Sequence, residues 1–336
     1  MTAAVGAPTI ERVSLGGALN AALRDAMRDD PAVLVMGEDV GVLGGVFRVT
    51  DGLLAEFGDD RVIDTPLAES GIVGTAIGLA LHGYRPVCEI QFDGFIYPAF
   101  DQIVSQLAKM RARSGGALKL PIVIRVPAAG GIGAVEHHSE SNEAYFTHTA
   151  GLRVVSCSSP SDAYHLLREA IRSDDPVIFF EPKRRYWDKG EIEAEPLPAG
   201  SARLLRAGTD CILLAHGPSV AVALAAAEAA AGDGVSVGVL DLRSLSPLDM
   251  PSITAAVQAS GRAIVVHEAS VNGGIGAELA ARIQQECFFS LEAPVLRVGA
   301  WDLPYPPSRT EKEFLPDVDR VLAALQESLE FGERAS

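Results

Sequence analysis

The sequence predicts an α/β protein in which parallel sheets are covered by helices on both faces. Short apolar runs alternate with segments of helical periodicity along most of the chain, an order typical of strand–helix–strand units. The runs are continuously apolar and rich in Val and Ile, as expected for strands buried on both faces. A composition of 48 % hydrophobic and 21 % charged residues is that of a globular protein, and 336 residues correspond to about two domains.

The first half of the chain contains most of these elements. A serine or proline precedes two of the helices, because Ser14 comes before the first helical pattern and Pro160 before Ser161 and Asp162. The predicted strands cover residues 32–38, 61–64, 86–92, 120–126, 152–156 and 177–181, and the predicted helices cover residues 15–28, 69–82, 96–113, 143–149 and 161–173.

A break in the periodic pattern separates two predicted domains. Charged residues, proline and glycine dominate residues 187–201, so we predict a domain at 1–190, a linker at 191–204 and a domain at 205–336. The second domain has a four- or five-stranded pattern. Its predicted strands cover residues 210–215, 235–241, 263–267 and 295–299, and its predicted helices cover residues 219–231, 249–259, 276–289 and 317–329.

The charge and hydropathy of the chain exclude several classes of protein. Acidic residues outnumber basic ones by 44 to 28, and the net charge of −16 repels phosphate backbones and anionic lipids. No apolar run approaches the ~20 residues of a membrane-spanning helix. Residues 1–10 lack the features of an export signal. We therefore expect no nucleic-acid or membrane partner, and no export.

The four cysteines bear on the compartment. Cys88, Cys157, Cys211 and Cys287 lie far apart in the sequence and could form two disulfides. Each stands inside an apolar run, where a buried thiol is more common than a disulfide. We expect buried thiols and a cytoplasmic, reducing environment.

The common nucleotide and nucleophile motifs fail in context. The pairs Gly131/Gly133 and Gly274/Gly276 lack the third glycine of a dinucleotide fingerprint. The sequence also has no phosphate-binding loop ending in Gly-Lys-Ser/Thr, no Gly-x-Ser-x-Gly elbow and no His-x3-His pair. Nicotinamide binding, nucleotide hydrolysis, serine hydrolysis and zinc chemistry therefore have no support.

Several segments, in order from about residue 12 to 325, together resemble one known family. They are GEDVGVLGGVFRV at 37–49, DTPLAESG at 64–71, residues 85–111, EHHSES at 136–141, IFFEPK at 178–183, HEA at 267–269 and QECFFSLEAPVLRV at 285–298. The set resembles the beta subunit of the thiamine diphosphate-dependent decarboxylating component of 2-oxo acid dehydrogenase complexes. The resemblance implies a transketolase-like pyrimidine-binding domain followed by a smaller α/β domain like the transketolase C-terminal domain. Residues 44–48, 88–92 and 285–294 resemble the branched-chain type more than the pyruvate type.

The resemblance assigns roles to five residues. Glu69 matches the carboxylate that shares a proton with N1′ of the cofactor pyrimidine, Phe95 matches the aromatic residue that stacks on that ring, and Leu67 would be a pocket wall. His138 matches the active-site histidine, which acts on the substrate carboxylate or on a proton during acyl transfer, and Gln91 would face the substrate pocket. From position alone, Glu69 reads as a surface residue that offsets a helix dipole and Phe95 as a core residue.

The resemblance also implies a bound potassium ion and an alpha chain that carries the magnesium–diphosphate site. Gly232 to Gly234 read Gly-Asp-Gly, which resembles the start of that site, but no asparagine follows between residues 235 and 271 to complete a shell of about six oxygen ligands. We therefore expect a turn here. The potassium ligands would come from Leu120, Ile122, Val123, Ala170, Ser173 and Asp175.

The predicted function is accordingly that of an enzyme subunit. Two beta chains would pair with two alpha chains, decarboxylate a branched-chain 2-oxo acid and reductively acylate lipoamide on an acyltransferase core, whose lipoyl and peripheral-subunit-binding domains would be partners. Two alternatives remain: the same chemistry on pyruvate or acetoin, and a noncatalytic scaffold half.

Overall fold

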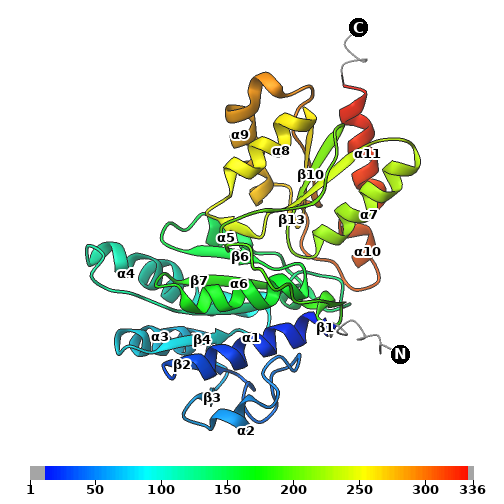
Figure 1. Ribbon diagram of the computed structural model, residues 1–336. Helices are drawn as coiled ribbons and strands as arrows, with labels where there is room; N and C mark the ends of the chain where they lie inside the picture. Colours follow the sequence, from blue (N-terminus) through cyan, green and yellow to red (C-terminus); the bar gives the residue numbers. More distant parts are fainter. Residues whose placement is uncertain (1–11, 332–336) are drawn as a thin grey trace, which may run out of the picture.

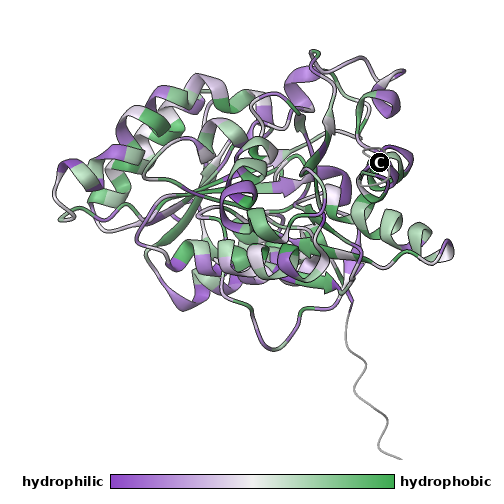
Figure 2. Ribbon diagram, turned by 90° about the horizontal axis from the view of Figure 1, so that it is seen from above, coloured by the Kyte–Doolittle hydropathy of each residue, from purple (hydrophilic) through white to green (hydrophobic). Residues whose placement is uncertain are grey.

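The computed structural model of the protein describes residues 12–331. The chain forms two sheets, each covered by helices, and the second sheet lies above one edge of the first (Figure 1). Hydrophobic residues gather on the central strands, and hydrophilic residues on the outer helices and loops (Figure 2). The predicted absence of an export signal in residues 1–10 lies outside the described residues. No helix within residues 12–331 is long and apolar enough to cross a membrane.

The larger sheet has seven strands in the order β12-β6-β7-β5-β4-β2-β3. All neighbours pair in parallel except β12, which runs antiparallel to β6. The sequence predicts six of these strands. Five of them are apolar runs buried on both faces, and β3 is a short, partly exposed edge strand, whereas β12 is not apparent from the pattern. The strands are β2 (Val33–Gly37), β3 (Val62–Asp64), β4 (Arg85–Glu89), β5 (Val123–Ala128), β6 (Arg153–Ser156), β7 (Val177–Pro182) and β12 (Ser244–Ser246).

Two layers of helices cover this sheet. On one face α1 (Leu15–Asp29) packs along α6 (Pro160–Arg172), and both bury their apolar sides on alternate strand residues such as Val35. The hydroxyls of Ser14 and Ser159 accept hydrogen bonds from the first turns of these two helices. On the opposite face α3 (Glu69–Leu81) and the segment at 93–113 pack with part of the second domain.

The helix predicted at residues 96–113 is interrupted. The structure has a 3-10 helix, η1 (Asp93–Ala99), then a π-helix, η2 (Gln102–Leu107), and only then a regular helix, α4 (Ala108–Arg113). Pro98 lies inside η1 and has no backbone N–H, so it cannot extend a regular hydrogen-bonded ladder. The apolar period is correct, but the prediction of one continuous α-helix is wrong.

The second sheet has five strands in the order β14-β13-β10-β11-β9, with β9 antiparallel to β11. Helices α7 and α11 pack on one of its faces, and α8 and α9 on the other. The strands are β9 (Arg203–Arg206), β10 (Cys211–Ala215), β11 (Val237–Asp241), β13 (Ala263–Ser270) and β14 (Leu296–Ala300), and the helices are α7 (Ser219–Gly232), α8 (Met250–Ser260), α9 (Ile275–Cys287) and α11 (Val318–Leu329).

The connections carry the remaining short elements. Residues 191–202 contain no helix or strand, and the predicted domain limits around them stay a prediction. Gly232 to Gly234 form the turn between α7 and β11, as expected, with Gly234 in the left-handed conformation at φ +80°. The short elements are β1 (Val13–Ser14), which pairs with β8 (Lys189–Gly190), α2 (Leu53–Phe57), α5 (Glu143–Thr147), α10 (Glu311–Phe314), and the 3-10 turns η3 (Glu136–His138), η4 (Lys183–Arg185) and η5 (Phe288–Ser290).

The four cysteines are buried and free, so the prediction of buried thiols is confirmed. Burial raises the pKa of the Cys88 and Cys211 thiols to about 12. These thiols therefore stay protonated at neutral pH and serve as small apolar side chains in the core.

Candidate active site

The predicted site residues lie after the carboxyl ends of neighbouring strands. Glu69 follows β3, Gln91 and Phe95 follow β4, and His138 lies in the loop after β5, while β2 stands between β3 and β4. Because these strands are parallel, their carboxyl ends meet at one edge of the sheet, where open α/β sheets bind ligands. Helix α3, which begins at Glu69, packs against η1, which carries Phe95.

Glu69 is buried at the first turn of α3. Its residue is only 8 % exposed, so the interpretation as a surface glutamate is wrong. Burial raises the pKa of Glu38, and the charges of Asp39 and Glu69 raise it further, which indicates that the carboxylates of Glu38 and Glu69 lie close together. Within the described residues the Glu69 carboxylate has no hydrogen-bond or ion-pair partner. The carboxylate is therefore free to accept a hydrogen bond from the N–H group of a bound ring.

Phe95 belongs to a cluster of four rings. Its ring centroid lies 5.1 Å from that of His138 and 5.7 Å from that of Phe92, both edge-on, and 6.0 Å from that of His137, nearly parallel. The ring centroid of Phe92 lies 4.1 Å from that of His138. Phe95 also packs against the core, so its burial on that side fixes a ring that is only partly covered on the other.

His138 is held as a neutral imidazole. Burial lowers its pKa, and the positive charges of His137 and Lys183 lower it further. Its Nδ1 atom is buried, and no group in the described residues hydrogen-bonds to it. A neutral ring with one unused nitrogen can give or take a proton.

A buried ion pair that sequence reasoning missed lies next to His138. The Lys183 ammonium donates to the Asp93 carboxylate at 2.8 Å, and both side chains are fully buried. Burial raises the pKa of Asp93 to about 6, even though the charge of Lys183 opposes this. The signal was present, since the matched segments 85–111 and 178–183 include both residues, but nothing in their spacing indicates that they pair.

Gln91 and Leu67 are the two remaining predicted site residues. The Gln91 amide nitrogen donates to the Asp39 carboxylate at 3.3 Å, which directs it toward the end of β2. Leu67 is 63 % exposed. The loop after β2 is fixed by the Asp64 carboxylate. This carboxylate accepts hydrogen bonds from the backbone nitrogens of Gly41 and Val42 at 2.6 and 3.2 Å.

Exposed apolar side chains occur on two segments next to the site, the loop after β2 and the stretch between β3 and α3. Val42 is 86 % exposed, and Leu43, Val46 and Leu67 are also exposed although all four are large hydrophobic residues. Exposed apolar groups that cluster beside buried polar ones are typical of a surface covered by a partner. The residues therefore fit one half of a cofactor site, the half that receives an aromatic ring and a protonated nitrogen.

The predicted potassium ligands surround the start of β5 and the end of α6. Leu120, Ile122 and Ala170 are buried, and the carbonyls of Ile122 and Ala170 each accept one backbone hydrogen bond, from Val177 and Ser173. The Asp175 carboxylate pairs with Arg111. A guanidinium at this carboxylate competes with a cation there, so the potassium site stays a prediction and no step is derived from it.

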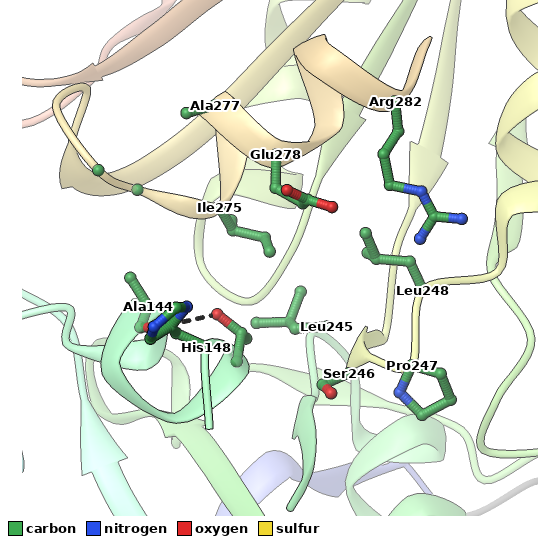
Figure 3. Close-up of a pocket in the computed structure, with 13 residues that line it drawn as sticks. Ala144, His148, Leu245, Ser246, Pro247, Leu248, Ile275, Ala277, Glu278 and Arg282 are labelled. Carbon is green, nitrogen blue, oxygen red and sulfur yellow. Dashed lines mark hydrogen bonds between the residues drawn. The ribbon is translucent and has the colours of Figure 1, made fainter. Parts of the chain in front are cut away.

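A cavity of about 660 Å³ lies elsewhere, between α5 and α9 (Figure 3). His148 and Leu245 line it from below, and Glu278 and Arg282 of α9 from above. Glu69, Phe95 and His138 are not among its lining residues. This cavity is therefore separate from the candidate active site.

Comparison with known proteins identifies both domains. Residues 11–188 match the family "Transketolase, pyrimidine binding domain", and residues 200–321 match "Transketolase, C-terminal domain". A solved structure described as "Split gene transketolase, inactive beta4 tetramer" aligns with a TM-score of 0.77 at 22 % identity, over 94 % of this chain and 98 % of that one. At this identity the likeness shows the fold alone.

Relatives in sequence cover nearly the whole chain. The chain is 56 % identical to "Pyruvate dehydrogenase E1 component subunit beta" of Leifsonia xyli subsp. xyli, over 96 % of this chain and 97 % of that protein. It is 55 % identical to "3-methyl-2-oxobutanoate dehydrogenase subunit beta" of Mycobacterium tuberculosis, over 93 % and 90 %. With these relatives and both domain matches, the chain belongs to the family of beta subunits of thiamine diphosphate-dependent 2-oxo acid dehydrogenases.

Proposed function

We propose that this chain is the beta subunit of a branched-chain 2-oxo acid dehydrogenase. With an alpha subunit it decarboxylates branched-chain 2-oxo acids and transfers the acyl group reductively to lipoamide. The observation that supports this most directly is the convergence of buried Glu69 with half-buried Phe95 and His138 at one edge of the parallel sheet, beside exposed apolar residues.

Glu69 and Phe95 would hold the pyrimidine of thiamine diphosphate, which when bound supplies the electron sink for decarboxylation. The Glu69 carboxylate would share a proton with the ring nitrogen N1′, a role that suits a buried carboxylate without another partner in the described part of the chain. Phe95 would pack on the ring, since its other face is fixed by the core, and Leu67 would support the cofactor once a partner covers it.

His138 would act on the substrate carboxylate or on the proton that moves during acyl transfer. Its lowered pKa keeps the imidazole neutral near pH 7, so it can accept a proton and return it. The nearby Lys183 ammonium favours this neutral form, and the Asp93 carboxylate fixes that ammonium at 2.8 Å. Gln91 would face the substrate.

An alpha chain would complete the site in a heterotetramer of two alpha and two beta chains. Exposed Val42 and Leu67 support such a partner. Gly232 to Gly234 lie at the turn after α7, and no asparagine follows between residues 235 and 271 to complete a magnesium shell. We therefore assign Mg²⁺ and the diphosphate to the alpha chain.

The remaining partners are domains of the acyltransferase core. The lipoyl domain would reach His138, and the peripheral-subunit-binding domain would dock on the C-terminal domain. A net charge of −16 favours a basic partner, and four buried free thiols are in keeping with a reducing cytoplasm.

The substrate class is the least constrained part of the proposal. Identities of 56 % to a pyruvate-type relative and 55 % to a branched-chain-type relative do not separate the two. Residues 44–48, 88–92 and 285–294 support the branched-chain type. Pyruvate and acetoin are the alternatives with the same chemistry, and a noncatalytic scaffold is the alternative without it.

The test is Glu69→Gln in the heterotetramer formed by co-expression with the alpha subunit. We expect decarboxylation of 3-methyl-2-oxobutanoate to fall by about 10²- to 10⁴-fold, with assembly intact, because the proton at N1′ loses its partner. Glu327→Gln, an exposed position on α11, is the matched control and should behave as wild type.

Two outcomes would contradict the proposal. Decarboxylation retained by Glu69→Gln would favour the scaffold. Wild-type activity on pyruvate or acetoin equal to or above that on 3-methyl-2-oxobutanoate would contradict the branched-chain assignment.

A further inference from the structure

We propose that Glu268, Tyr305 and Glu311 of the C-terminal domain are positioning residues that hold the loop carrying His138 in its working shape. The inference rests on the proposed function for the role of His138. It gives the C-terminal domain a role in the active site. The loop belongs to the N-terminal domain, and contacts between the two domains fix it in place.

The loop that carries His138 connects β5 to α5, and its two ends lie close together. The backbone nitrogen of Ala129 donates to the carbonyl of Glu140 at 2.9 Å, so residues 130–139 form a loop whose ends are joined. His138 lies near the end of this loop, in η3. On one side the loop rests on η1, because Gly94 packs so tightly on the His137 backbone that a Cβ there would lie 2.6 Å from it.

Carboxylates of the C-terminal domain grip the opposite side of the loop through its backbone. Glu268 accepts from the nitrogen of Gly130 at 3.1 Å. Glu311 accepts from the nitrogens of Gly131 at 3.0 Å and Gly133 at 3.2 Å. Three nearby N–H groups directed at carboxylates form the kind of anion-binding concavity that successive backbone donors create.

The two carboxylates are themselves held in place. Glu268 and Glu311 are both buried. The Tyr305 hydroxyl donates to Glu311 at 2.6 Å, and burial, together with this bond, raises the pKa of Tyr305, so the hydroxyl stays a donor. Arg184 pairs with Glu268 and donates to the Gly130 carbonyl at 3.1 Å, which closes the network from the loop's own domain.

Steric contacts show how closely the loop is seated. A Cβ on Gly130 would overlap the Tyr305 hydroxyl, and one on Gly131 would overlap the side chain of Arg184. Gly131 and Gly133 also have φ values of +91° and +73°, which side chains with a Cβ rarely adopt. Glycine at position 130 therefore lets the loop approach the C-terminal domain, and glycine at 131 and 133 permits the backbone conformation of the loop.

These contacts leave His138 with little freedom. Its ring packs on Phe92 and Phe95. Its buried Nδ1 has no hydrogen-bond partner in the part of the chain that the structure describes. The direction of the imidazole therefore depends on the loop backbone, and the loop backbone depends on Glu268 and Glu311. Helix α10, which begins at Glu311, lies at the end of the C-terminal domain nearest the larger sheet (Figure 1).

The test uses Glu311→Gln and Tyr305→Phe in the heterotetramer with the alpha subunit. The amide introduced by Glu311→Gln keeps one acceptor oxygen but loses the charge, so folding should persist while the grip on Gly131 and Gly133 weakens. We expect hydrogen exchange in residues 130–141 to accelerate by about tenfold or more, with α6 unchanged. Glu313→Gln, exposed on the same short helix, is the control and should match wild type.

Kinetics separate positioning from general stability. We expect Glu311→Gln to lower kcat by about tenfold per assembled, cofactor-loaded tetramer, with KM for the 2-oxo acid nearly unchanged, since misplacing a group that acts in the reaction affects kcat first. Tyr305→Phe should give a smaller loss in the same direction. Wild-type exchange in residues 130–141 of Glu311→Gln, or faster exchange with wild-type kcat, would overturn the inference. Inactivity of the wild-type tetramer on every 2-oxo acid would instead contradict the proposed function, and loop exchange alone would then decide the inference.

Discussion

At the scale of single residues, the junction between the domains contains a buried pair whose two members are both neutral between about pH 3 and pH 7. Glu143 of α5 and His216 after β10 are both buried, and the carboxylate oxygen lies 3.5 Å from the ring nitrogen Nε2. Burial raises the pKa of Glu143 to about 7, with smaller contributions from Glu268 and Asp93. Burial, then the charge of His267, lowers the pKa of His216 to about 3.

The two shifts have opposite effects on stability. Glu143 keeps its proton up to about pH 7 when folded but only to about pH 4.5 when unfolded, so its contribution to the unfolding free energy falls as pH rises through this window. His216 takes a proton near pH 6.5 when unfolded but only near pH 3 when folded, so its contribution rises with pH over that range. Each slope is about 1.4 kcal/mol per pH unit, and between pH 4.5 and 6.5 they cancel.

The Glu143→Gln variant should therefore show the pH dependence of the unfolding free energy that His216 contributes, because the opposing contribution of Glu143 is removed. The free energy of unfolding of this variant should rise relative to wild type by about 1.4 kcal/mol per pH unit between pH 4.5 and 7. Urea denaturation across this range, followed by circular dichroism, measures the difference. Glu228→Gln, on a side chain that is 80 % exposed, should track the wild-type curve. A Glu143→Gln curve parallel to wild type would refute the neutral pair.

At the scale of elements, the side chain of Asp317 caps the N-terminus of α11 in the C-terminal domain. The Asp317 carboxylate accepts from the backbone nitrogen of Arg320 at 2.8 Å, and α11 buries Val321 and Leu325 against the sheet that it shares with α7. An acceptor at this position satisfies one of the N–H groups that a helix start leaves free.

Replacing Asp317 should separate capping from charge. Asp317→Ala loses the acceptor and should lower the free energy of unfolding by about 1 kcal/mol. Asp317→Asn keeps an acceptor oxygen and loses only the charge, so it should lie within a few tenths of a kcal/mol of wild type. Thermal unfolding of the three proteins compares them, and equal losses for Ala and Asn would show that the charge alone matters.

The sequence predicts well those helices and strands whose hydrophobic pattern and end signals lie within the element itself. The predicted helix 15–28 differs from α1 by one residue at one end, and the predicted helix 161–173 differs from α6 by one residue at each end. Both are close because each helix carries its own apolar stripe and its own cap. Besides the two-residue strands β1 and β8, one strand of each large sheet escaped prediction for a physical reason. β12 has three residues and exists because Ser244 pairs with Val155, far away in the sequence, and β9 is a short edge strand with exposed Leu204 and Leu205.

At the scale of the whole molecule, the site depends on contacts that no local pattern contains. The family resemblance names Glu69, Phe95 and His138, and the parallel sheet explains why they meet at one edge. Glu268 and Glu311 could not be found this way, because more than a hundred residues separate them from the glycines that they hold, and only the docking of the two domains brings them together.

The same reasoning limits what the chain can bind alone. Its own groups would receive only the aromatic end of thiamine diphosphate, with Glu69 buried and Leu67 open to solvent, while the diphosphate and Mg²⁺ need oxygen ligands that we assign to the alpha chain. Calorimetry on the purified beta chain should therefore detect no Mg²⁺-dependent affinity for thiamine diphosphate, whereas the heterotetramer should bind it and lose it on Mg²⁺ removal by a chelator. Micromolar, Mg²⁺-dependent binding to the beta chain alone would mean that it holds a complete cofactor site, and the division of the site between two chains would have to be abandoned.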